Sequence, residues 1–150
     1  MEKKAISWSE FGRSAEHLVS KIRAAEISYD LVIGIARGGI PAALLIANRL
    51  RIRIDFVNIK SYIRAYTREK PKILSTLSEE VKDRRILVVD DIVDSGDTMR
   101  TILEWLRPQD PKKIETAALF VKPWSSITPN YFVRNVSEWI VFPWENEQQG

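Results

Sequence analysis

The run from Ile86 to Thr98, ILVVDDIVDSGDT, constrains the fold of this chain more than any other segment. It begins with four apolar residues, three of them β-branched, a composition typical of a strand buried on both faces. Two adjacent carboxylates, Asp90 and Asp91, stand at the carboxyl end of that strand. A helix begins at the loop over 94–98, and the apolar pattern predicts that it ends at Arg107. The run therefore predicts a strand, an acidic tip, a loop of small residues and a helix in succession.

A loop of small residues between a strand and a helix can hold a phosphorylated ligand. Backbone N–H groups of the loop and of the helix N-terminus point at the anion, and the helix dipole favours its charge. Gly96 has no side chain, so the backbone can approach the ligand closely there. The sequence contains no G-x-x-x-x-G-K-[ST] loop of a nucleotide hydrolase, and Ile92 and Val93 break the acid spacing of a calcium loop. Solvated carboxylates followed by a capped helix remain the structural alternative.

Periodic apolar patterns along the rest of the chain predict one α/β domain over residues 1–150. Ser7 and Glu10 have the spacing of a capping box at the start of the first helix. Strands that alternate with helices form a mostly parallel sheet with helices on both faces, and ligands bind beyond the carboxyl ends of its strands. The expected elements are helices over about 8–25, 41–50 and 98–107, strands over 31–36, 52–60, 86–90 and 114–121, and extended pieces near 131–133 and 139–142.

Composition excludes several classes of function. The chain has no cysteine, and so it has no disulfide framework, thiolate metal site or thiol nucleophile. A net charge of +3 is too small to indicate nucleic-acid binding. No apolar run reaches the length of a membrane span and residues 1–4 lack the apolar core of a signal peptide, so a cytoplasmic protein without membrane partners is expected. His17, the single histidine, lies off the apolar stripe of the first helix and is expected on the surface.

The run around Asp90 and Asp91 resembles the phosphoribosyl-pyrophosphate motif of the type I phosphoribosyltransferases. The resemblance implies that these two acids contact the ribose hydroxyls of phosphoribosyl pyrophosphate. The carboxylate of Asp97 is unfavourable beside a phosphate, so we expect its backbone N–H to bind and its side chain to turn toward solvent. The implied cofactor is Mg²⁺, held mainly by substrate and water, with Asp91 taking part through the ribose or through water. The residues implied around the 5′-phosphate are Asp94, Ser95, Gly96, Asp97 and Thr98.

A second loop, GIARGG over residues 34–39, resembles the pyrophosphate loop of the same family. The resemblance implies that Arg37 and the N–H groups of Gly38 and Gly39 bind the leaving pyrophosphate. Members of the family often hold the peptide bond before the basic residue in the cis form, which predicts a cis bond between Ala36 and Arg37. Glycine-rich turns are common and are weak evidence alone. This one supports a pyrophosphate site because the chain also contains the acidic run.

Residues 60–72 carry five basic side chains and a single acid, Glu69. The family has a flexible loop at this point, and the pair Ser61-Tyr62 resembles its start in 6-oxopurine enzymes. The resemblance implies a lid over about 61–78 that closes on pyrophosphate and excludes water. A solvated polar loop is the alternative. The lid residues singled out are Ser61, Tyr62 and Arg64.

The choice of purine base is predicted from two further segments. Asp94 stands where the hypoxanthine, guanine and xanthine enzymes of the family carry Asp, which implies a general base near purine N7, with helix capping as the alternative. Residues 122–145 resemble the base-recognition segment of microbial and archaeal xanthine-guanine phosphoribosyltransferases. On that resemblance Lys122 donates a hydrogen bond to the 6-oxo group and Trp139 stacks on the ring. Backbone contacts to the 2-substituent are implied at Ile140 and near Glu145.

The resemblance covers the chain from Trp8 to Glu145 and implies a type I phosphoribosyltransferase fold with a small C-terminal hood. The implied reaction transfers ribose 5-phosphate from phosphoribosyl pyrophosphate to guanine, xanthine or hypoxanthine, giving GMP, XMP or IMP and pyrophosphate, in a homodimer or homotetramer. One alternative is a regulator of this fold that binds nucleic acid, for which the sequence offers no added segment. Another is an enzyme for a different base such as adenine, against which Asp94 and Lys122 argue. The tryptophans expected to pack in the core are Trp8, Trp105 and Trp124.

Overall fold

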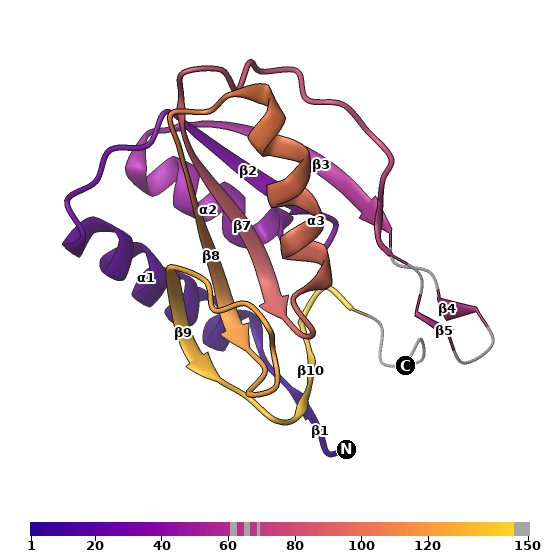
Figure 1. Cartoon of the computed structure of the whole chain (residues 1–150). Coiled ribbons are helices and arrows are strands. Elements are labelled where there is room, and N and C mark those ends of the chain that lie inside the picture. The colour runs from indigo at the N-terminus through magenta and orange to yellow at the C-terminus, as the bar shows by residue number, and fades with distance from the viewer. Residues whose placement is uncertain (61–62, 65–66, 69, 146–150) are drawn as a thin grey trace.

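A six-stranded sheet forms the centre of the computed structural model, which describes residues 1–60, 63–64, 67–68 and 70–145 (Figure 1). Its strands, in chain order, are β2 (Leu31–Ala36), β3 (Arg53–Lys60), β6 (Lys72–Ile73), β7 (Arg85–Val93), β8 (Lys113–Val121) and β9 (Tyr131–Asn135). Across the sheet the order is β6-β3-β2-β7-β8-β9. The strands from β3 to β9 in that order run parallel, and β6 pairs antiparallel with β3 at one edge. The prediction of a mostly parallel sheet is confirmed.

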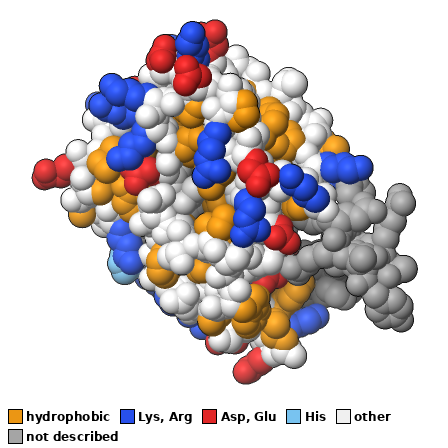
Figure 2. All heavy atoms as spheres, in the orientation of Figure 1, with side chains coloured by type: hydrophobic (Ala, Val, Ile, Leu, Met, Phe, Trp, Pro, Cys, Tyr) orange, Lys and Arg blue, Asp and Glu red, His pale blue; other side chains and the backbone are white. Residues whose placement is uncertain are grey.

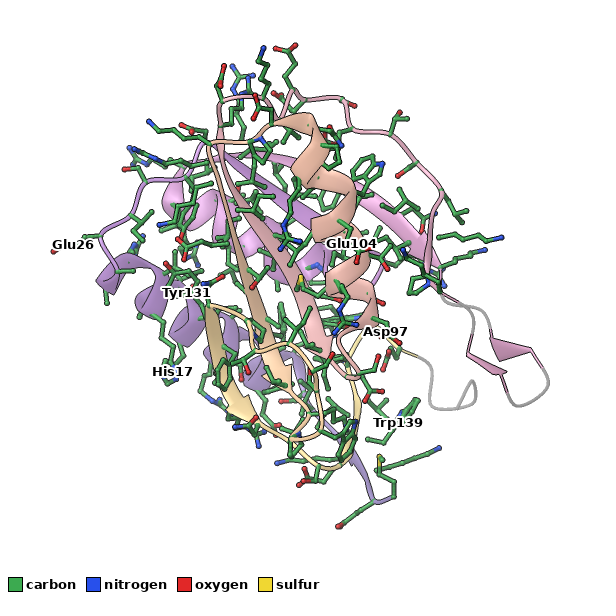
Figure 3. All side chains as sticks on the ribbon, viewed as in Figure 1. His17, Glu26, Asp97, Glu104, Tyr131 and Trp139 are labelled. Carbon is green, nitrogen blue, oxygen red and sulfur yellow. The ribbon has the colours of Figure 1, made fainter. Side chains whose placement is uncertain are left out.

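Helices cover both faces of this sheet, as the alternation of strands and helices predicts (Figure 1). They are α1 (Trp8–Ala24), α2 (Ile40–Leu50) and α3 (Asp97–Leu106), which continues into the 3-10 turn η1 (Arg107–Gln109). α1 and α2 pack on one face, and α3 packs on the other. The capping spacing at α1 is confirmed, because the Ser7 hydroxyl accepts a hydrogen bond of 3.1 Å from the Glu10 N–H. His17 points outward from α1 and is exposed, as expected (Figure 3).

Strand β7 separates the two hydrophobic cores. Leu87 and Val89 pack in the core beneath α1 and α2, whereas Ile86 and Val88 pack in the core beneath α3. All four side chains are fully buried, and burying each one contributes about 1.5–3 kcal/mol of hydrophobic free energy. A central strand covered on both faces therefore requires an apolar run without alternation. The central position of this strand also places the residues that follow the run at the carboxyl end of the sheet.

Smaller elements lie outside the main sheet. β1 (Lys3–Ala5) pairs in parallel with β10 (Trp139–Val141), and β4 (Ile63–Arg64) pairs with β5 (Thr67–Arg68) away from the body of the molecule (Figure 1). Figure 2 shows acidic and basic side chains interspersed over one face of the described part, without a continuous basic surface there. Among the described residues, no helix combines the length and the apolar character needed to cross a membrane.

Two of the tryptophans predicted for the core lie at the surface instead. Trp8 is 60% exposed and Trp124 is 52% exposed, whereas Trp105 is half-buried against the core beneath α3. Trp8 is the first residue of α1, and its ring packs on that of Trp144 at the molecular surface, with the centroids 5.9 Å apart. Trp124 is held outside the core by a hydrogen bond to the Asp94 carboxylate.

Candidate active site

The two loops singled out by the sequence meet at the carboxyl end of the sheet. β2 and β7 are parallel neighbours in register, with Gly34 beside Val89, so the chain leaves both strands at the same edge. A Cβ atom built on Gly38 would lie 2.4 Å from Oδ2 of Asp91. A Cβ atom built on Gly39 would lie 2.7 Å from the Val89 carbonyl oxygen. The glycines are therefore needed at these positions because the loop after β2 lies directly on the end of β7.

The acidic pair lies inside β7 and not beyond its end, which corrects the predicted strand boundary at residue 90. The physical reason is the neighbouring strand: β8 pairs with β7 as far as Val93, opposite Val121. The Lys122 N–H then donates to the Val93 carbonyl at 2.9 Å, which continues the ladder. Pairing with β8 therefore extends the strand to Ile92 and Val93, which a free loop would leave without strand partners.

Both carboxyl groups of the pair are buried, each residue being 9% exposed. Burial raises the pKa of Asp90 well above its ordinary value, and the charge of Asp91 raises it further. Burial also raises the pKa of Asp91, although a hydrogen bond from Asp90 and the backbone N–H of Ile92 offset part of that rise. Burying two adjacent carboxyl groups lowers the stability of the fold, so a purely structural role does not explain them. A ligand that presents hydroxyl groups would provide the hydrogen-bond donors that such a pair requires.

The loop after β2 has the conformation predicted for it. The peptide bond between Ala36 and Arg37 is cis, as expected. The Gly39 N–H donates to the Ile35 carbonyl at 2.8 Å, and the N–H of Ile40 donates to the Arg37 carbonyl at 3.1 Å. The Arg37 side chain is exposed and can reach an anion from solvent. The Gly39 N–H has a protein partner in this structure, so an arriving pyrophosphate would share or replace that bond.

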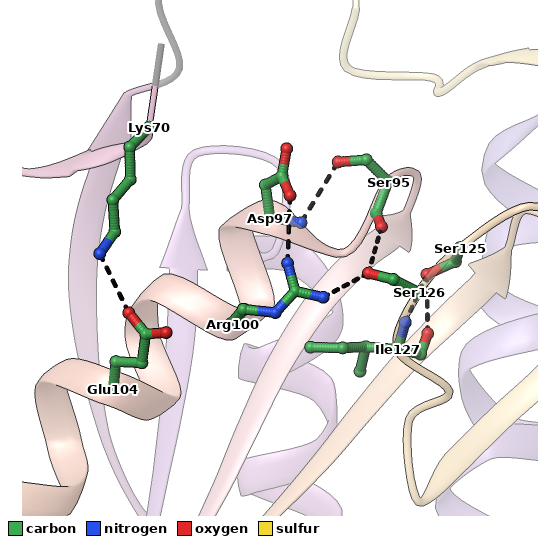
Figure 4. A network of polar contacts seen from close by, with 8 residues as sticks. All are labelled: Lys70, Ser95, Asp97, Arg100, Glu104, Ser125, Ser126 and Ile127. Atoms are coloured by element: carbon green, nitrogen blue, oxygen red, sulfur yellow. Dashed lines mark hydrogen bonds and ion pairs between the residues drawn. The ribbon is translucent and has the colours of Figure 1, made fainter. Parts of the chain in front are cut away.

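The loop after β7 is tied to the segment that follows β8 (Figure 4). Gly96 adopts a left-handed conformation with φ of 97°, and a Cβ atom there would lie 2.8 Å from the Ser126 hydroxyl. Both the N–H and the hydroxyl of Ser126 donate to the Ser95 carbonyl, at 3.0 and 2.9 Å. The Asp97 N–H donates to the Ser95 hydroxyl at 3.2 Å. This loop is therefore shaped by contacts with a segment some thirty positions later in the chain.

Asp97 differs in part from the expectation that its carboxylate turns to solvent. Its side chain is 42% exposed, but one carboxylate oxygen pairs with the Arg100 guanidinium at 3.3 Å (Figure 4). The same guanidinium donates to the Ser126 hydroxyl. The spacing of three residues on a helix could have revealed this pair, because such residues are neighbours on the helix surface. Arg100 thus offsets a negative charge that would oppose a phosphate in this loop.

Among the predicted base-recognition residues, Lys122 contacts the residue that precedes β10. Its ammonium group is buried, donates to the backbone carbonyl of Glu138, and lies 5.4 Å from the centre of the Trp124 ring. Trp139 follows Glu138 directly, is 51% exposed and projects from β10 near the end of the molecule that also holds Asp97 (Figure 3). Of the two residues named for the 2-substituent, Ile140 is buried, and the Glu145 carboxylate accepts a hydrogen bond of 3.0 Å from the Phe142 N–H.

Trp124 is the site residue that the sequence did not reveal. Its indole N–H donates to Oδ1 of Asp94 at 2.8 Å. The available signal was its position two residues after Lys122, which places both in the turn that leaves β8. The hydrophobic character of tryptophan favoured the core instead.

The predicted lid is described only in part. Ser61 and Tyr62 lie outside the described residues, and the structure describes the backbone of Arg64 within β4 but not its side chain. The later part of the segment is bonded to the body: the Leu74 N–H donates to the Asn58 carbonyl at 2.8 Å. The ammonium of Lys70 pairs with Glu104 of α3 at 3.1 Å (Figure 4). Closure of a lid over pyrophosphate stays a prediction.

Comparisons with known proteins cover nearly the whole chain. A family model described as "Phosphoribosyl transferase domain" matches residues 7–149. The chain is 30% identical to the xanthine-guanine phosphoribosyltransferase of Idiomarina loihiensis, over 93% of this chain and 85% of the relative. It is 33% identical to the enzyme of the same name from Roseobacter denitrificans, over 93% and 84%. The crystal structure of the purine phosphoribosyltransferase from Pyrococcus horikoshii Ot3 matches with a TM-score of 0.87 at 34% identity, covering 97% and 95%.

Proposed function

Because the chain belongs to the phosphoribosyl transferase domain family, we propose that it is a purine salvage phosphoribosyltransferase. It transfers ribose 5-phosphate from phosphoribosyl pyrophosphate to guanine, xanthine or hypoxanthine, and it releases the nucleoside 5′-monophosphate and pyrophosphate. The observation that carries the proposal is the close contact of Gly38 with Asp91, which unites the acidic strand end and the glycine loop in a single site. Residues 1–150 act as one domain in this proposal, and the chain assembles as a homodimer or homotetramer.

Phosphoribosyl pyrophosphate lies across the two loops at the end of the sheet. Asp90 and Asp91 accept hydrogen bonds from the ribose hydroxyls, and these donors favour the charged carboxylates that burial disfavours. The 5′-phosphate lies against the N-terminus of α3, where backbone N–H groups and the helix dipole favour an anion. Arg37 meets the pyrophosphate from the loop after β2. These contacts hold C1′ of the ribose in a fixed position between the leaving group and the base.

The acidic pair also fits Mg²⁺ in the role that the family implies. Carboxylate oxygens are the ligand type that this ion prefers, and the ion usually retains several waters beside one or two carboxylates and phosphates. Within the described residues, no group of three or more His, Cys, Asp or Glu side chains could hold a metal ion. The donor set therefore suits an ion held mainly by pyrophosphate and ribose oxygens, with Asp91 acting through the ribose or water. When bound, Mg²⁺ would offset the negative charge of the departing pyrophosphate.

The chemical step needs positioning and charge stabilisation, without a covalent intermediate. The bond from C1′ to pyrophosphate breaks while the bond from C1′ to a purine ring nitrogen forms, so positive charge develops on the ribose. When N9 attacks C1′, the proton on N7 must leave the base, and Asp94 at the mouth of the same loop is the carboxylate that would accept it. Lys122 can donate a hydrogen bond to a 6-oxo group and cannot accept one from the amino group of adenine.

A panel of free bases tests this function. Purified protein is incubated with phosphoribosyl pyrophosphate, Mg²⁺ and guanine, xanthine, hypoxanthine or adenine, and nucleotides are separated by chromatography. We expect GMP, XMP or IMP from the 6-oxopurines and little AMP. Asp94→Asn is the inactive comparison, and Asp110→Asn, an exposed residue beyond η1, is the matched control of the same chemical change. Equal use of adenine and guanine, or no nucleotide from any base, would contradict the proposal.

A further inference from the structure

Trp124 touches two of the groups proposed to read the base. It lies in the turn between β8 and β9 and is 52% exposed. Its indole N–H donates to Oδ1 of Asp94 at 2.8 Å. Its ring lies beneath the ammonium group of Lys122, which is 5.4 Å from the ring centre. One side chain thus contacts both the proposed proton acceptor and the proposed reader of the 6-oxo group.

The contacts of Lys122 extend this arrangement to the stacking residue. The ammonium group also donates to the carbonyl of Glu138, and Trp139 is the next residue along the chain. An ammonium group has three N–H bonds, so these contacts leave donor capacity for a ligand. Asp94, Trp124, Lys122 and the start of β10 therefore form a continuous series of contacts.

The geometry points to Trp124 as a positioning residue for base recognition and proton transfer, an inference that rests on the proposed function. In a 6-oxopurine the exocyclic oxygen and N7 lie side by side on one edge of the ring. A side chain that fixes Asp94 and Lys122 together sets the spacing between the two groups that meet this edge. The indole N–H is a donor without acceptor capacity, so its partner must be an acceptor such as the carboxylate. It occupies one carboxylate oxygen and leaves the other for the purine proton.

The physical gain is restriction of Asp94 beside a Lys122 side chain that burial and the Glu138 carbonyl already hold. Asp94 is exposed and lies in a loop, where its carboxylate would sample several orientations without a partner. A hydrogen bond to an ionised carboxylate is stronger than a neutral one. The face of an aromatic ring attracts the ammonium group of Lys122 through the ring quadrupole. Simple core packing does not account for a ring that is half exposed and directs its N–H at a carboxylate.

Two substitutions separate positioning from packing. Trp124→Phe keeps an aromatic ring beneath Lys122 but removes the N–H group. Trp124→His has the smaller ring, yet its Nε2 is joined to Cβ through the same number of bonds as the indole nitrogen and can donate when it carries the proton. At pH 8, where an ordinary imidazole of pKa about 6.5 is neutral, we expect Trp124→Phe to lower kcat about tenfold, which is about 1.4 kcal/mol. The KM for phosphoribosyl pyrophosphate should be unchanged.

The ranking of these variants decides the question. Positioning predicts that Trp124→His retains more of kcat than Trp124→Phe, whereas packing predicts the reverse because Phe fills more of the tryptophan volume. Trp105→Phe, at the other end of α3, is the control for losing a tryptophan and should match the wild type. A Trp124→Phe variant with wild-type kcat, or one more active than Trp124→His, overturns the inference.

A second measurement does not depend on catalysis. In ¹⁵N-labelled protein the indole N–H resonance of Trp124 is assigned by its absence from the Trp124→Phe spectrum. Asp94→Ala removes the acceptor and should shift this resonance, whereas Asp110→Asn should leave it in place. An unshifted resonance in Asp94→Ala overturns the inference whatever the activity. A shifted resonance together with a wild type that uses no base refutes the proposed function and leaves the Trp124–Asp94 bond established.

Discussion

Replacing Gly38 with alanine should separate folding from function. The added Cβ would lie 2.4 Å from Oδ2 of Asp91, whereas ordinary contacts of such an atom begin at 3.4 Å. Asp91 must therefore withdraw by about 1 Å, and a displacement of that size in a reacting assembly costs about 100-fold in rate. Gly38 does not adopt the left-handed conformation, so alanine adds no backbone strain. Alanine also restricts the unfolded chain, which contributes about 0.4–1 kcal/mol and offsets part of the cost of moving Asp91.

The assay compares kcat/KM for phosphoribosyl pyrophosphate with the midpoint of thermal unfolding. We expect kcat/KM to fall about 100-fold while the melting temperature changes by no more than a few degrees. Gly12→Ala is the matched control, since a Cβ on Gly12 has nothing within 4 Å in the middle of α1. That control should raise stability by about 1 kcal/mol without changing activity.

A double-mutant cycle identifies the cause of the loss. Asp91→Ala removes the side chain that the new methyl group would strike, so Gly38→Ala should cost almost nothing further in that background. Near-wild-type kcat/KM in Gly38→Ala would refute the reasoning. An equally large loss in the Asp91→Ala background would show that alanine acts through something other than the carboxylate.

Three further predictions concern the charged groups of the site. Burial and the charge of Asp91 raise the pKa of Asp90 in the folded protein. The stability that depends on protonation of Asp90 is therefore fully present below its unfolded pKa of about 3.9. That stability is lost as pH rises through the folded pKa. Asp90→Asn should therefore raise the melting temperature at pH 7 by about 3 °C, flatten its pH dependence in scanning calorimetry and weaken phosphoribosyl pyrophosphate binding; an unchanged melting temperature would contradict this. Asp94→Asn should slow nucleotide formation by about 10²–10⁴-fold while calorimetric binding of phosphoribosyl pyrophosphate stays intact, and a turnover near that of the wild type would remove Asp94 as the base. Lys122→Ala should reduce kcat/KM for guanine and hypoxanthine far more than for adenine, and an unchanged preference in the base panel would refute its reading of the 6-oxo group.

Much of the fold was predictable because periodic patterns report burial directly. The apolar run before Asp90 identified the central strand, and the alternation of strands and helices identified a parallel sheet. The extension of β7 to Val93 was not predictable, because it depends on pairing with β8, whose residues are remote in sequence. β1 has no apolar pattern at all, and it is a strand only because β10 lies beside it.

The candidate site was likewise predictable from the sequence only in part. Asp91 and Gly38 could each be singled out by the motif in which they stand. Their mutual contact follows from β2 and β7 being neighbours, a relation that neither motif contains. Trp124 was misplaced because the burial preference of tryptophan outweighs its single polar group in any sequence pattern, whereas a hydrogen bond to a loop thirty positions away decides its place.

The pairing of β1 with β10 has a bearing on biosynthesis. Lys3 lies opposite Trp139, so β1 has no partner strand until β10 has been translated. The strands from β2 to β8 and the helices between them can form before that partner leaves the ribosome, because domains fold as their segments emerge. A chain that terminates before residue 139 would thus leave β1 without a partner, and it would lack Trp139, the residue proposed to stack on the base.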